Sequence, residues 1–134
     1  MQIKQLFGDD SNYDEKSFFL IAGPCVVENE TMPLEIGRVL KDITDRLGIP
    51  FIFKASYRKA NRSSISSFTG IGDEKALQVL AEVKRQLQVP VITDIHSRAE
   101  MGFINSSYSA VPKIAGSNSS PRMTPNRSAP AVVF

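Results

Sequence analysis

A cluster of cations follows the second apolar run of the sequence. Lys54, Lys59 and Arg62 fall within nine residues, and Asn61 and Ser63 add small hydrogen-bonding groups beside them. Ammonium groups and a forked guanidinium suit the oxygens of phosphates or carboxylates. The pattern therefore predicts an anion-binding segment, although a solvated charged loop has the same composition.

A second candidate pair, Asp94 and His96, ends the third apolar run. Residues at positions i and i+2 of a strand point to the same face. From that face a carboxylate and an imidazole could orient a substrate hydroxyl and handle a proton. A hydrogen-bonded structural pair is the alternative, and the spacing does not separate the two.

The single cysteine, Cys25, follows the first apolar run. It is a candidate metal ligand, a candidate nucleophile or a small buried apolar residue, and the last is commonest for a lone cysteine. A catalytic zinc site typically takes three protein ligands, and the sequence holds no closely spaced ligand cluster. One cysteine cannot form an internal disulfide, so nothing indicates an oxidising compartment.

Alternating apolar runs and helical patterns position these residues. Continuous apolar runs at 17–22, 51–53 and 89–95 predict buried strands. Apolar residues spaced by three and four predict one helix over about 30–47 and another from Asp73, taken as its cap, to about Leu87. Gly48 is a natural left-handed stop for the first helix. The order strand, helix, strand, helix, strand implies parallel strands joined by right-handed crossovers.

This order opens both Rossmann folds and (β/α)8 barrels. A Rossmann fold usually carries G-x-G-x-x-G after its first strand, whereas this chain has Gly23-Pro24-Cys25 there. We therefore predict an α/β fold, namely the N-terminal part of a (β/α)8 TIM barrel with about three strands and two helices, followed by an irregular tail. In barrels the C-terminal ends of the strands build the active site, and the candidate residues above follow those ends.

The composition of the chain changes near residue 97. Residues 1–96 carry 12 basic and 13 acidic side chains, whereas residues 97–134 carry four basic side chains, one acidic side chain, eight serines and four prolines. We therefore predict a barrel-like part, 1–97, and an irregular tail, 98–134, that is disordered or the product of a frameshift. The net charge of +2 does not favour nucleic acid, and no apolar segment reaches the roughly 20 residues of a membrane span. We expect neither partner, and we expect a cytoplasmic protein.

Three stretches resemble 3-deoxy-8-phosphooctulonate synthase, also called 2-dehydro-3-deoxyphosphooctonate aldolase. They are AGPCVVE at 22–28, IPFIFKASYRKANRSSISSF at 49–68 and VPVITDIH at 89–96, and the resemblance covers about residues 17–97. It implies a homotetrameric, cytoplasmic TIM-barrel transferase that condenses phosphoenolpyruvate with arabinose 5-phosphate and water for lipopolysaccharide synthesis. The sister 3-deoxy-7-phosphoheptulonate synthase, which prefers erythrose 4-phosphate, shares the AGPC start and matches KANRSS less well.

The resemblance also implies roles for the candidate substrate-binding residues. Lys54 and Lys59 match the lysines near phosphoenolpyruvate, and Lys59 could also orient the attacking water. The residues that match the arabinose 5-phosphate site are Asn61, Arg62 and Ser63, with Arg62 placed for the sugar phosphate.

Two further matches concern catalysis and metal. Asp94 and His96 match the pair that positions the sugar and the reacting water. Cys25 matches the first metal ligand of the metal-dependent branch of the family, so the resemblance implies a divalent metal.

The chain also departs from the family. Tyr57-Arg58 stands where the family commonly has Phe-Asp, and Thr69 stands where it commonly has Arg. Beyond Ser97 the family's later metal ligands and later phosphoenolpyruvate-binding Lys and Arg have no counterparts, and a barrel takes about 250 residues. We therefore expect the 134-residue chain alone to lack synthase activity. A non-catalytic phosphosugar-binding fragment is the alternative.

Overall fold

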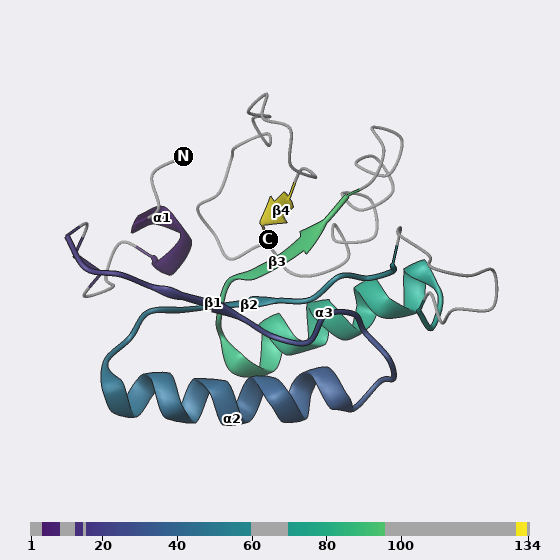
Figure 1. Ribbon diagram of the computed structural model, residues 1–134, viewed down its shortest axis with the longest axis horizontal. Helices are drawn as coiled ribbons and strands as arrows, with labels where there is room; N and C mark the ends of the chain where they lie inside the picture. Colours follow the sequence, from purple (N-terminus) through teal and green to yellow (C-terminus); the bar gives the residue numbers. More distant parts are fainter. Residues whose placement is uncertain (1–3, 9–12, 15, 60–69, 96–130, 134) are drawn as a thin grey trace.

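A four-stranded sheet forms the centre of the computed structural model, which describes residues 4–8, 13–14, 16–59, 70–95 and 131–133 (Figure 1). The strands are β1 (Leu20–Ala22), β2 (Phe51–Lys54), β3 (Val91–Asp94) and β4 (Ala131–Val133), and they lie side by side in that order. The first three are parallel, as the alternating pattern predicts. This arrangement, with a helix after each of the first two strands, is that of the first part of a (β/α)8 barrel.

Two helices cover one face of the sheet. They are α2 (Met32–Leu47), which packs on β2, and α3 (Asp73–Leu87), which packs on β3 and on α2. The end of α2 is confirmed, because Gly48 adopts the left-handed conformation with φ of 65°. The prediction for the start of α3 is wrong in one detail. Gly72 is the N-cap residue, and Asp73 lies in the first turn, where it makes an ion pair instead of a cap.

Strand alternation gives the sheet an apolar face and a polar end on its other face. Phe53, Val91 and Thr93 are completely buried, and Phe53 and Val91 belong to the main hydrophobic core with α3. Because neighbouring residues of a strand point to opposite faces, Lys54 and Asp94 point away from the helices. The fold therefore directs both candidate site residues to the face that the interior of a barrel would occupy.

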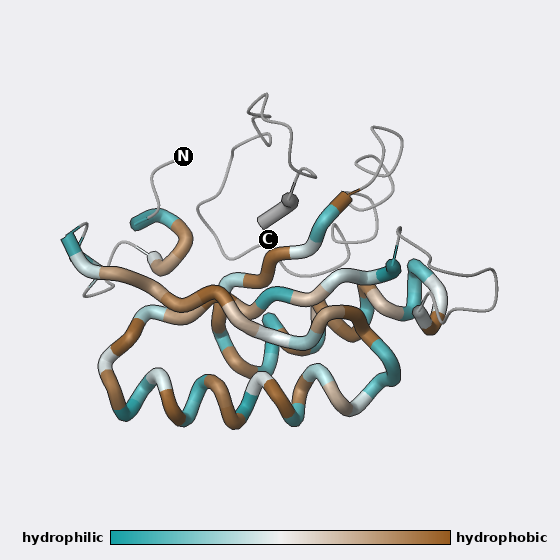
Figure 2. Tube along the Cα trace, viewed as in Figure 1, coloured by the Kyte–Doolittle hydropathy of each residue, from teal (hydrophilic) through white to brown (hydrophobic). Residues whose placement is uncertain are grey.

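Several apolar residues of α2 are exposed to solvent, and Figure 2 shows hydrophobic residues recurring along this helix. Val39 is 61%, Ile43 39% and Leu47 66% exposed, although all three belong to the apolar pattern that predicts the helix. The residues of α2 that are buried are Pro33, Gly37 and Thr44. The periodicity therefore predicts the helix correctly, but these three residues of its apolar stripe lie on a surface of the kind that neighbouring helices cover in barrels.

The N-terminal segment lies on the other side of the sheet from α2 and α3 (Figure 1). It contains α1 (Lys4–Phe7), a four-residue helix that the apolar pattern does not predict. The rings of Phe7, Tyr13 and Phe19 form a cluster with centroid separations of 5.2, 5.9 and 6.1 Å. These aromatic contacts attach the segment to the residue that precedes β1.

The last strand differs from the prediction of an irregular tail. Within 98–134, residues 131–133 form β4, which pairs antiparallel with β3 and places Asp94 opposite Ala131. The free edge of β3 offers unpaired backbone groups to a short β-prone segment, and an antiparallel edge strand on a parallel sheet is common. Residues 96–130 lie outside the described part, so the remaining prediction for the tail stays a prediction.

Among the helices in the described part of the chain, none combines the length and the apolar character that crossing a membrane requires.

Candidate functional site at the C-terminal ends of the parallel strands

The candidate site is built on the ends of β2 and β3. Lys54 is the last residue of β2 and Asp94 is the last residue of β3. Lys54 is paired in register with Ile92, so Ser56 and Asp94, each two residues further along, lie at the same level of the sheet. The strand register therefore brings one cation, one hydroxyl and one carboxylate together, at the edge where barrels build their active sites.

These three side chains form a chain of polar contacts. The Ser56 hydroxyl donates a hydrogen bond of 2.6 Å to Asp94 Oδ1. Lys54 Nζ donates to Ser56 Oγ at 3.3 Å and lies 3.6 Å from Asp94 Oδ1. The lysine side chain is 39% exposed and the aspartate side chain 24%. An ammonium group and a carboxylate thus stand close together and remain open to solvent.

The backbone around this site is fixed by hydrogen bonds to both neighbouring segments. Ser56 forms an isolated parallel bridge with Val26, and the Val27 amide donates to the Ser56 carbonyl at 2.9 Å. On the other side, the Tyr57 amide donates to Oγ1 of the buried Thr93 at 3.2 Å. The segment after β2 is therefore held between β3 and the extension of β1.

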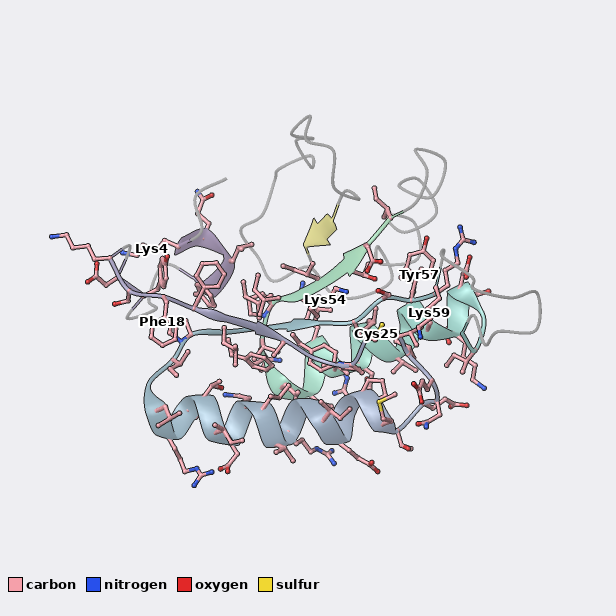
Figure 3. All side chains as sticks on the ribbon, viewed as in Figure 1. Lys4, Phe18, Cys25, Lys54, Tyr57 and Lys59 are labelled. Carbon is pink, nitrogen blue, oxygen red and sulfur yellow. The ribbon has the colours of Figure 1, made fainter. Side chains whose placement is uncertain are left out.

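Cys25 lies on the extension of β1 and is exposed, with no disulfide. Its carbonyl accepts a hydrogen bond of 3.4 Å from the Ser56 amide. In Figure 3, Cys25, Tyr57 and Lys59 lie at the end of the sheet opposite Phe18. Among the described residues no group of three His, Cys, Asp or Glu side chains could hold a metal ion. These residues alone do not satisfy a catalytic metal.

A second ionic contact fixes the chain just before Lys59. Arg58 Nη1 lies 3.0 Å from Asp73 Oδ2 in the first turn of α3, and its guanidinium carbon lies 5.5 Å from the centre of the Tyr57 ring. Gly70 also lies close, since a Cβ atom there would be 3.0 Å from the Tyr57 carbonyl oxygen. The chain around Tyr57 and Arg58 is thus anchored to the start of α3, while Lys59 itself is exposed.

The candidate residues fall into two groups. The structure describes Lys54, Lys59, Asp94 and Cys25, and it brings Lys54 and Asp94 together. The other candidates lie outside the described residues, and their roles stay predictions: Asn61, Arg62, Ser63 and His96.

Sequence reasoning missed one member of the site. Ser56 is 6% exposed and links Lys54 to Asp94. It stands at i+2 from Lys54, which is the same alternation that pairs Asp94 with His96. That spacing could have identified Ser56, whereas its contact with Asp94 depends on strand register.

The parallel βα units, with polar groups at the strand ends, are those of the first part of a (β/α)8 barrel. The sequence model of the DAHP synthetase I family matches residues 4–116. Since that match covers most of the sequence, the chain belongs to the DAHP synthetase I family. The match extends past residue 97, where we predict the barrel-like part to end.

Individual relatives of this chain carry a more specific name than the family model does. A 2-dehydro-3-deoxyphosphooctonate aldolase from Methylibium petroleiphilum is 59% identical over 97 residues, which are 72% of this chain and 34% of the relative. The aldolase of that name from Polaromonas naphthalenivorans gives the same identity and coverage. One from Cupriavidus taiwanensis is 60% identical over 87 residues, 65% of this chain and 30% of the relative. The chain therefore spans about a third of the length of the curated relatives it matches.

Proposed function

We propose that this chain carries the first third of the active site of a 3-deoxy-8-phosphooctulonate synthase. The reaction condenses phosphoenolpyruvate with arabinose 5-phosphate and water, and it releases phosphate. The observation that supports the proposal is the meeting of Lys54, Ser56 and Asp94 at the C-terminal ends of two adjacent parallel strands. The names and the identity of the aldolase relatives agree with it.

Each described side chain suits a part of this chemistry. The partly exposed ammonium of Lys54 attracts a phosphate or carboxylate group of phosphoenolpyruvate. Lys59 adds a second exposed cation on the segment that follows β2. Asp94 is suited to accept a hydrogen bond from a sugar hydroxyl, because its carboxylate already accepts one from the hydroxyl of Ser56.

Cys25 remains our candidate for one metal ligand. An exposed thiol at the strand ends is chemically suited to a divalent transition metal. The described residues supply no set of three ligands, so the roles given to Lys54 and Asp94 above involve no metal. Homotetramer formation, a cytoplasmic location and the absence of nucleic-acid and membrane partners also stay predictions.

The direct test is binding of phosphoenolpyruvate to the purified 134-residue chain, measured by isothermal titration calorimetry. We expect Lys54→Met to weaken binding roughly tenfold or more, since a hydrogen bond to a charged group contributes about 1.5–3 kcal/mol. The matched control is Lys75→Met, which removes a lysine that pairs with Glu30 on the outside of α3. The proposal fails if the unmodified chain does not bind, or if the two variants lose the same affinity.

Turnover gives a second measurement. With phosphoenolpyruvate, arabinose 5-phosphate and a divalent metal, we expect no phosphate release above background from the 134-residue chain. Clear turnover would show that our expectation of an inactive chain is wrong. Binding without turnover, together with a cooperative thermal melt, is the behaviour of a phosphosugar-binding fragment.

The sister activity, 3-deoxy-7-phosphoheptulonate synthesis, is the second candidate because the matching family model carries its name. The two activities differ in the sugar phosphate. A competition titration with arabinose 5-phosphate and erythrose 4-phosphate separates them, and we expect the five-carbon sugar to bind more tightly.

A further inference from the structure

The two hydrogen bonds that link Lys54, Ser56 and Asp94 both donate in the same direction, from the lysine toward the carboxylate. The hydroxyl of Ser56 has one proton, and its 2.6 Å contact with Asp94 Oδ1 uses that proton, because a carboxylate can only accept. Lys54 Nζ lies 3.3 Å from Ser56 Oγ and must therefore donate to a lone pair of that oxygen. Hydrogen bonds arranged in this sequence polarise and strengthen one another.

Ser56 is the rigid member of the three. Its side chain is buried, its amide donates to the Cys25 carbonyl at 3.4 Å, and its carbonyl accepts from the Val27 amide at 2.9 Å. Lys54, by contrast, carries its ammonium group on a flexible four-carbon stem that is 39% exposed. The position of the ammonium group therefore follows the serine oxygen.

The direct ion pair competes with this arrangement. Lys54 Nζ is 3.6 Å from Asp94 Oδ1, which is beyond the usual length of about 2.7–2.9 Å for an ammonium–carboxylate hydrogen bond. A small rotation of the lysine would close that gap. In that direct ion pair, Lys54 would donate a hydrogen bond to the Asp94 carboxylate. The carboxylate would then offset the positive charge that attracts an anion to Lys54.

We propose that Ser56 is a positioning residue whose hydroxyl holds the Lys54 ammonium off the Asp94 carboxylate and so keeps the lysine available to an anion. The identity of that anion, phosphoenolpyruvate, rests on the proposed function. The separation of lysine and aspartate is a property of the chain without ligand. The two statements can therefore fail separately.

The ligand-free measurement is nuclear magnetic resonance of the lysine ammonium groups. In Ser56→Ala we expect the Lys54 ammonium to contact Asp94 directly, which slows the exchange of its protons with water severalfold. Ser56→Thr keeps a hydroxyl and should resemble the unmodified chain. The proposal is overturned if Ser56→Ala leaves the Lys54 ammonium signal unchanged.

The binding measurement uses a double-mutant cycle with phosphoenolpyruvate, and inorganic phosphate as a simpler probe. We expect Ser56→Ala to weaken binding about fivefold to tenfold in the normal background. In an Asp94→Asn background the competing charge is absent, so the same substitution should change affinity less than twofold. An equal loss in both backgrounds would identify a purely structural role and overturn the proposal.

If the unmodified chain binds neither probe, the proposed function fails. The ammonium measurement then decides the role of Ser56 by itself.

Discussion

Gly23 provides the sharpest test of how the strands are placed around the site. A Cβ atom at this position would lie 2.1 Å from the Lys54 carbonyl oxygen and 3.0 Å from its carbonyl carbon. Both atoms belong to the backbone of β2, so no side-chain rotation can relieve the contact. Gly23→Ala must therefore separate the end of β1 from the end of β2.

The size of the effect follows from the contacts beside Gly23. Relief of the clash needs a shift of about 1 Å, and overpacking of this kind typically costs about 1–3 kcal/mol. The same shift stretches the hydrogen bonds between the Cys25–Val27 segment and Ser56, which contribute roughly 1 kcal/mol each. We expect a loss of about 3 kcal/mol in the free energy of unfolding, and a displaced Lys54.

Urea unfolding followed by circular dichroism measures this loss, and Gly48→Ala is the matched control. Gly48 has a φ of 65° and no atom within 4 Å of an added Cβ, so only the left-handed strain of about 1 kcal/mol applies there. The expected order is a larger loss for Gly23 than for Gly48. Equal losses, or a smaller loss at Gly23, would refute the proposed close approach of the two strands.

Three further outcomes test separate parts of the chain. Arg58→Ala breaks the ion pair with Asp73, but both side chains are 37% exposed, so we expect urea unfolding to show a loss of only about 0.5 kcal/mol. A variant in which the charges of both residues are reversed should recover the lost free energy of unfolding. The hydrogen bond from Arg85 lowers the pKa of Glu82 to about 2 from its ordinary value of 4.5. A carboxyl with a lowered pKa contributes stability that is present above pH 4.5 and is lost as the pH falls through about 2. A carboxyl carbon titration should show that low midpoint, and Arg85→Ala should return it toward 4.5. Finally, if Cys25 binds metal, cobalt(II) should produce a thiolate charge-transfer band that Cys25→Ala abolishes, and the absence of the band in the unmodified chain would exclude this role.

Long periodic elements are the part of the fold that the sequence predicts best. The helix predicted from near Asp73 to about Leu87 agrees with α3 except for its cap residue, because its apolar spacing is regular. The strands are predicted in the right places, but their ends differ. The predictions 17–22 and 89–95 are longer than β1 (Leu20–Ala22) and β3 (Val91–Asp94), whereas 51–53 is one residue shorter than β2 (Phe51–Lys54). An apolar run marks burial, whereas a strand begins where the backbone of a neighbour accepts its hydrogen bonds.

Short elements depend on contacts that no local pattern contains. α1 is only four residues long, and the ring cluster of Phe7 with Tyr13 and Phe19 accompanies it. β4 has three residues and pairs with the edge of β3. Neither segment has enough repeats for a period to be detected, so both lie beyond prediction from spacing.

The site shows the same division between local and non-local information. Alternation along a strand predicts that Asp94 points to the face opposite the helices, and this follows from one strand alone. The contact of Asp94 with Ser56 needs the register between Lys54 and Ile92, which is a property of two strands. A sequence can therefore identify residues of such a site, whereas their contacts become known only from the register between strands.

The strand register also allows the strands that place the site to be compared with β4, which the sequence does not predict. β4 runs against the direction that a strand next to β3 takes in a closed barrel, where all strands are parallel. Lys54, Ser56 and Asp94 are nevertheless placed by β2, β3 and the extension of β1, which are all parallel to one another. The strand register that brings these three residues together therefore belongs to the parallel strands. The arrangement of Lys54, Ser56 and Asp94 should thus persist whichever strand pairs with the far edge of β3.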